Sequence, residues 1–172
     1  MAHICLISTG HLTSNPRLVK EADALTKAGH VVKVIHGSCY WPHQAEDLAF
    51  AGRGWSVAVS VPFGQLASPW LRWRQRLRQR LSSWLALVGL HFLPLVRRAG
   101  HPASSELVRA ALAVKADLYI AHYPAALPAA ALAAKKWSAK YAFDAEDFHT
   151  GDLPGHPAFA HQRTLISLLE RH

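Results

Sequence analysis

The sequence predicts an α/β fold, in which a parallel sheet is covered by helices on both faces. Short apolar runs alternate with longer stretches of helical periodicity along most of the 172 residues. The connections between successive runs are long enough to hold a helix, as parallel strand pairing requires. Apolar residues make up 51% of the chain, which is enough for a core and argues against disorder. The length suits one domain, residues 1–172.

The elements follow in a regular order. The first helix has Asn15 as a plausible N-cap, Pro16 at its first position and Gly29 as its stop. Ser104 or Ser105 is expected to cap the next helix. The pattern indicates a doubly wound, Rossmann-like sheet with right-handed crossovers. Strands are predicted at residues 3–8, 31–36, 55–61, 117–121 and 140–144, and helices at residues 16–28, 104–115, 127–138 and 158–171.

Cysteine usage and the first residues favour a cytoplasmic protein. Cys5 falls in a buried strand and Cys39 in a loop, so we expect two free thiols in a reducing compartment. The apolar run that follows Met1 is too short for a signal peptide and has no basic region before it.

Polar residues follow several of the predicted strands. In open α/β sheets, ligands bind at the carboxyl ends of the strands, where helix amino termini also favour anions. The loop after the first strand is therefore expected to meet an anion or a polyol. Two bland alternatives stay open: Ser14 and Asn15 only cap a helix, and Asp144 only caps a turn. The candidate binding residues are Ser8, Thr9, Gly10, His11, Ser14, Asn15, Arg17, His36, Tyr123, Asp144, Asp147 and His149, with His122 and Glu146 as candidate catalytic residues.

The loop lacks the GxGxxG fingerprint, which argues against a dinucleotide-binding oxidoreductase or epimerase. The stretch STGHLTSNPRLVKEADALTKAGHVVKVI instead resembles the opening of the amino-terminal domain of GT-B glycosyltransferases, of the retaining, family-4-like group. Pro16, Arg17, Lys20, Glu21 and Ala22 form the most specific part of this motif. A later stretch, ADLYIAHYPAALPAAALAAKKWSAKYAFDAEDFH, resembles the same domain. The resemblance covers residues 3–171 except 62–100.

This resemblance implies the acceptor-binding half of a GT-B enzyme. The full enzyme would transfer a sugar, with retention, from a UDP- or GDP-linked donor to a lipid-linked or cell-envelope glycan. A second domain would hold most of the donor, so we expect residues 1–172 to be incomplete at the carboxyl end and inactive alone. No metal or other cofactor is expected, because helix amino ends and positive side chains can stabilise the diphosphate.

The resemblance also suggests individual roles. His122 matches a histidine that faces the reacting sugar, and Gly10 matches a loop that approaches donor phosphate and acceptor. Glu146, with Asp144 and Asp147, matches an acidic segment after the fifth strand. The chain reads DAED where many relatives have a histidine before the glutamate, so the role of Glu146 stays open.

The formal charge of +8 is concentrated in one segment, residues 66–99, which we interpret as a basic amphipathic helical insertion. Seven arginines and no acidic residue lie between Trp70 and Ala99, whereas charges nearly cancel elsewhere. On a helix, one broad face would carry Trp70, Trp73, Leu77, Leu81, Trp84, Leu85, Val88, Phe92 and Leu95. Such a helix is typical of the interface of an anionic membrane, here the inner face of the cell membrane. The predicted membrane-contact residues are Trp70, Arg72, Trp73, Arg74, Arg76, Arg78, Arg80 and Trp84.

Other interpretations of this segment remain open. The apolar run 81–96 is shorter than the roughly 20 residues of a membrane span. No recognition motif supports nucleic-acid binding, and we expect no nucleic-acid partner. The helix could instead pack on its own domain with a solvated arginine face. A non-catalytic module that docks on a membrane or a partner protein is the rival function, and an exposed apolar face could also form a homodimer.

Overall fold

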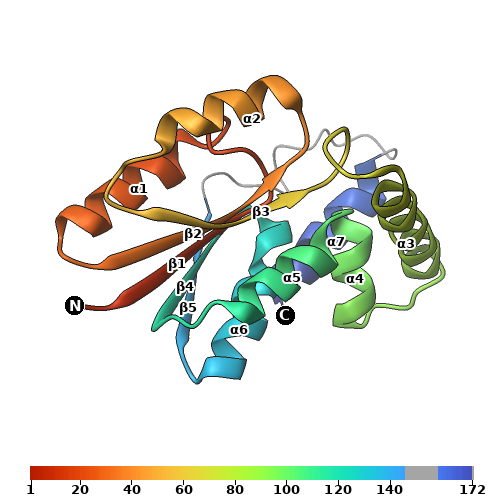
Figure 1. Ribbon diagram of the computed structural model, residues 1–172. Helices are drawn as coiled ribbons and strands as arrows, with labels where there is room; N and C mark the ends of the chain where they lie inside the picture. The colour runs from red at the N-terminus through yellow and green to blue at the C-terminus, as the bar shows by residue number, and fades with distance from the viewer. Residues whose placement is uncertain (146–158, 172) are drawn as a thin grey trace.

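The computed structural model describes residues 1–145 and 159–171 and contains one parallel five-stranded sheet (Figure 1). The strand order is β3-β2-β1-β4-β5, and every neighbouring pair is parallel. The chain starts in the middle of the sheet, builds outward to β3, and crosses back to place β4 beside β1. This order confirms the predicted Rossmann-like sheet, and the switch point of the sheet lies between β1 and β4. The strands are β1 (His3–Ser8), β2 (Val31–Ser38), β3 (Ser56–Pro62), β4 (Leu118–His122) and β5 (Lys140–Asp144).

Helices cover both faces of the sheet, as predicted. In Figure 1, α1 and α2 lie on one side of the sheet, and α5 and α6 lie on the other, with α4, α7 and α3 stacked beyond α5. The short helix α2 was not predicted. The helices are α1 (Pro16–Lys27), α2 (Trp41–Asp47), α3 (Pro69–Leu87), α4 (Leu93–Gly100), α5 (Ser104–Ala113), α6 (Leu127–Trp137) and α7 (Ala160–Arg171), with 3-10 turns η1 (Leu48–Phe50) and η2 (Pro124–Ala126).

The core lies on the two faces of the sheet. Alternate residues of β1 point in opposite directions: Ile4 and Leu6 pack with Leu18 of α1, whereas Cys5 and Ile7 pack in the cluster that includes α5 and α6. Burial on both faces explains why the central strands read as continuous apolar runs rather than as alternating ones.

Helix α1 begins as its sequence predicts. The Oδ1 atom of Asn15 accepts a hydrogen bond from the backbone N–H of Leu18 at 2.9 Å, and Pro16 occupies the first turn. Gly29 follows the helix with φ +86°, a left-handed conformation that glycine adopts without strain. In contrast, the expected serine cap of α5 is wrong: its N-cap is Ala103, without a side-chain bond.

The basic segment forms two helices rather than one. The chain turns after α3 at Gly89, whose φ is +92°, and Pro94 then lies in the first turn of α4. Leu95, predicted on the outer apolar face, is buried between the helices as a result. No helix of the described residues is both long enough and apolar enough for a bilayer span.

Candidate functional site

The carboxyl ends of four neighbouring strands lie side by side at one edge of the sheet. In the strand register, Ser8 at the end of β1 pairs with His36 of β2 on one side and His122 of β4 on the other. His122 in turn pairs with Asp144, the last residue of β5. The convergence that the sequence predicted at this edge is therefore present, and it is centred on the switch point.

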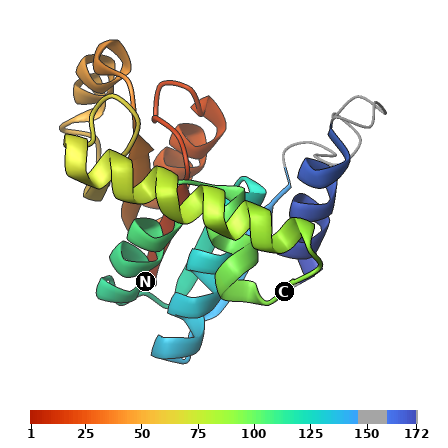
Figure 2. The same ribbon diagram turned by 90° about the vertical axis from the view of Figure 1, so that its right-hand side faces the viewer.

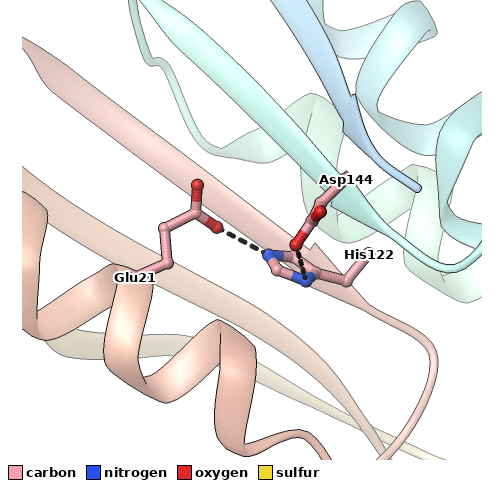
Figure 3. A group of neighbouring side chains, drawn as sticks. All are labelled: Glu21, His122 and Asp144. Atoms are coloured by element: carbon pink, nitrogen blue, oxygen red, sulfur yellow. Dashed lines mark hydrogen bonds and ion pairs between the residues drawn. The ribbon is translucent and has the colours of Figure 1, made fainter. Parts of the chain in front are cut away.

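His122 lies between two carboxylates (Figure 3). Its Nε2 atom is 2.8 Å from Oε2 of Glu21, and its Nδ1 atom is 3.5 Å from Oδ2 of Asp144. The imidazole is fully buried, whereas both carboxylates are partly exposed. Glu21 comes from α1, 101 positions away in the chain. The ring is thus fixed on both nitrogens by groups from a helix and a neighbouring strand.

Arg17 completes this group, which we call the switch-point cluster: Arg17, Glu21, His122 and Asp144. The Nε atom of Arg17 is 2.8 Å from Oδ2 of Asp144. Arg17 and Glu21 are one helical turn apart, so α1 presents both to the same edge. An open pocket of about 490 Å³ lies beside the cluster, lined by Arg17, Lys20, Glu21, Ile120, Ala142, Phe143 and Asp144.

Glu21, His122 and Asp144 are also a potential metal-ligand set, since one donor atom of each lies within 4.8 Å of the others. The geometry fits an ion-pair network better. Glu21 approaches one ring nitrogen and Asp144 the other, and a cation can bind only one of them. The guanidinium of Arg17 on Asp144 would also repel a cation.

The loop after β1 is held by a second buried group, centred on His11 and Asp47. Nε2 of His11 accepts hydrogen bonds from the backbone N–H groups of Cys39 and Tyr40 at 2.9 and 3.1 Å. Its Nδ1 atom must then carry the proton and donates to Oδ2 of Asp47 at 2.7 Å. The other oxygen of Asp47 accepts from the backbone N–H of Thr13 at 3.0 Å. Both nitrogens of His11, a predicted binding residue, are therefore used inside the protein.

Most other polar groups of this loop also bond internally. The hydroxyl of Ser8 accepts from the backbone N–H of Gly10 at 3.2 Å, and that of Ser14 donates to the carbonyl of His11 at 2.9 Å. Ser8 and Asn15 are buried, whereas Thr9 and Gly10 are partly exposed. The hydroxyl groups of Ser8 and Ser14 are therefore engaged within the loop itself.

Gly37 allows the loop to pass close to β2. A Cβ atom at Gly37 would overlap the backbone carbonyl of Thr9. Beside it, His36 is buried, and burial lowers its pKa, although the charge of Asp47 opposes that effect. The Nδ1 atom of His36 lies 3.1 Å from the backbone carbonyl of Gly37.

Tyr123 directly follows His122 and has φ +71°, which is uncommon for a residue with a side chain. It lines a second pocket, of about 390 Å³, enclosed by α3, the end of α4, η2 and α7. This pocket contains apolar groups of α7 and the neutral side chains of Gln79 and Ser83.

Three predicted site residues, Glu146, Asp147 and His149, lie outside the described residues. The predicted membrane-contact residues all belong to α3. Two residues of the site were not singled out from the sequence: Glu21, which appeared only within the helix motif, and Asp47, whose helix was not predicted. Their partners are distant in the chain, so no local signal marks them.

The scan against protein-family models and the search of curated proteins found no match. Among solved structures, the chain is similar to the crystal structure of CalG4, the calicheamicin glycosyltransferase, with a TM-score of 0.48 and 15% sequence identity. The match covers 99% of this chain and 42% of that one, so this chain spans less than half of the length of CalG4.

Proposed function

We propose that this chain is the acceptor-binding half of a glycosyltransferase. The complete enzyme would transfer a sugar, with retention, from a UDP- or GDP-linked donor to a lipid-linked or cell-envelope glycan. A second Rossmann-like domain would bind most of the donor. The proposal includes a cytoplasmic location, peripheral to the inner face of the membrane.

The switch-point cluster is the observation that carries this proposal. A histidine fixed by two carboxylates at the carboxyl edge of a parallel sheet lies where ligands bind in folds of this kind. The adjoining pocket presents Arg17, Lys20 and Glu21, and these charged side chains suit a polyhydroxylated and partly anionic ligand.

In this proposal the residues have distinct roles. His122 serves the reacting sugar, and Glu21 and Asp144 hold its ring in position. Arg17, Lys20 and the positive end of α1 favour the negative charge that develops on the leaving diphosphate. In this proposal Arg17 and Lys20 stabilise the diphosphate without a metal ion. Glu146 is kept as a candidate catalytic residue on the sequence resemblance alone.

The test is an assay of the full-length gene product with a panel of UDP- and GDP-sugars and membrane extract as the acceptor source. The His122→Ala variant is expected to lose activity, with His3→Ala as the control. His3 is the exposed first residue of β1, at the opposite end of that strand from the switch-point cluster. Full activity in His122→Ala would refute the role of the cluster.

The rival function is a non-catalytic module that docks on a membrane or a partner protein. The exposure of Trp70, Trp73 and Trp84 on α3 favours it. The two functions differ in nucleotide binding. A full-length product that binds neither UDP- nor GDP-sugars and transfers no sugar would support the docking module.

A further inference from the structure

Helix α3 packs on the protein through its polar face. The residues that it buries are Gln75, Ser82 and Ala86, and the side-chain amide of Gln75 donates to the carbonyl of Pro62 at 3.1 Å. This packing argues against the alternative interpretation, in which the helix buries its apolar face on its own domain and exposes its arginines. Helical spacing explains which face is buried, because it places the small and amide side chains on the side of α3 opposite the tryptophans.

The apolar face of α3 is consequently directed outward, and Figure 2 shows the helix lying across the outside of the molecule. The outward stripe comprises Trp70, Trp73, Leu77, Leu81 and Trp84, which are each between 40% and 66% exposed. Trp70 and Trp73 stack on each other, with ring centroids 4.9 Å apart. The stripe continues through the end of α3 into the turn before α4: Leu87, Val88, Leu90 and Phe92 are also exposed.

The arginines on the two sides of this stripe differ in their partners. On one side, Nη2 of Arg78 lies 2.7 Å from both carboxylate oxygens of Glu106, and Nη2 of Arg74 lies 3.3 Å from one of them. Burial raises the pKa of Glu106, but the hydrogen bond and charge of Arg78 outweigh it and leave the pKa below its usual value. Arg74 and Arg78 are thus used to hold α3 on α5.

On the other side, Arg72, Arg76 and Arg80 have no carboxylate partner among residues 1–145 and 159–171. Together with Pro69, Trp73 and Leu77 they line a shallow pocket of about 260 Å³. A pocket with three cations and an apolar wall suits a phosphate that carries an apolar tail.

We propose that α3 and the turn after it dock the protein on an anionic phospholipid surface. The outward stripe lies in the interfacial layer, and Arg72, Arg76 and Arg80 bind lipid phosphates. This inference names the membrane-facing surface of the enzyme proposed above, and it rests on that proposal only for its biological purpose. The pocket lined by Gln79, Ser83 and Tyr123 lies on the other side of α3. In this orientation the pocket is about one helix diameter, about 10 Å, from the lipid.

Charge favours a lipid surface over a second copy of the chain. A two-fold interface places the same patch against itself, so it would bring Arg72, Arg76 and Arg80 close to their own copies. No acidic residue of α3, the following turn or α4 could compensate them. Anionic lipid supplies the opposite charge and the apolar phase together.

The test is co-sedimentation of the chain with vesicles of phosphatidylcholine alone and with about one-third phosphatidylglycerol. We expect retention by the anionic vesicles that falls as salt is raised. The double variant Arg76→Gln/Arg80→Gln should lower the partition coefficient about twenty-five-fold, at about fivefold for each charge. The matched control Arg74→Gln/Arg78→Gln removes the same charge from the same helix, and it should bind within about threefold of the unmodified chain.

Tryptophan fluorescence tests the orientation. Brominated lipid should quench the unmodified chain and Trp41→Phe alike, because Trp41 is exposed on α2. Quenching should be largely lost in Trp70→Phe/Trp73→Phe/Trp84→Phe. Circular dichroism establishes that every variant is folded.

Three results would overturn the inference. The anionic vesicles could fail to retain the chain at low salt, or the two arginine double variants could lose binding equally. Light scattering could also show a stable dimer that does not bind vesicles. The outcome is separate from the proposed function. Vesicle binding by a chain whose full-length product transfers no sugar would support the docking surface and refute the enzyme. Sugar transfer without vesicle binding would support the enzyme and refute the docking surface.

Discussion

Replacement of Asp47 by alanine should destabilise the protein strongly, although Asp47 touches no proposed substrate. The carboxylate is buried and accepts two hydrogen bonds, from the ring of His11 and from the backbone of Thr13. Its removal leaves both donors without a partner. The loop after β1 then loses its connection to α2.

The magnitude follows from the two bonds. A hydrogen bond to a charged group contributes about 1.5–3 kcal/mol, and such contributions within one group are less than additive. We therefore expect a loss of about 3–4 kcal/mol in the free energy of unfolding, out of the roughly 5–15 kcal/mol typical of a domain. Asp47→Asn keeps one acceptor oxygen and should lose about half as much.

The assay is urea unfolding at pH 7, with circular dichroism as the readout of the transition. Glu46→Ala is the matched control, because Glu46 is the preceding residue and forms only an exposed ion pair with His43 in the described structure. It should change the free energy of unfolding by less than about 0.5 kcal/mol. Equal effects of the two substitutions would refute the assignment of His11 and Asp47 as the support of the loop.

Three further predictions concern pH, packing and thiol reactivity. Burial lowers the pKa of His101 to about 4, so as the pH falls the unfolded chain takes up a proton on this residue before the folded chain does. The free energy of unfolding should therefore fall by about 1–3 kcal/mol as the pH drops from above 6.5 toward 4. Urea titrations at several pH values should show a shallower pH slope in His101→Gln, and an unchanged slope would contradict this cause. Gly37→Ala should cost about 1–3 kcal/mol through overlap with the loop, whereas Gly10→Ala, where a methyl group makes ordinary contact, should cost clearly less in the same assay. Burial raises the pKa of Cys5 to about 12, so alkylation of the native chain at pH 8, followed by mass spectrometry, should label Cys39 well before Cys5, and equal labelling would refute the burial of Cys5.

The elements whose causes are local were predictable from the sequence. The five strands appear where the apolar runs predict them, within two residues at each end. Helix α1 starts at Pro16 because Asn15 caps it, and both signals lie in adjacent positions. The order of strands and crossovers also limits the sheet to few arrangements.

The break in the basic segment was also marked locally but was missed. Gly89 is a turn signal and Pro94 is a helix-start signal. They were overlooked because the apolar periodicity of the segment extends across both. The unpredicted α2 likewise starts with a proline in its first turn.

The sequence alone determined the strands, their parallel pairing and the gathering of His36, His122 and Asp144 at one edge of the sheet. These features follow from strand periodicity and from the length of the connections, which are local properties of the chain. The order of the strands, and with it the switch point, came from the tertiary structure. Only the tertiary structure decided that Glu21 reaches His122, and that Asp47 reaches His11. It also decided which face of α3 is covered. Those outcomes depend on which surfaces α4 and α5 present to the helix, and the periodicity of one segment carries no information about the partner that will cover it.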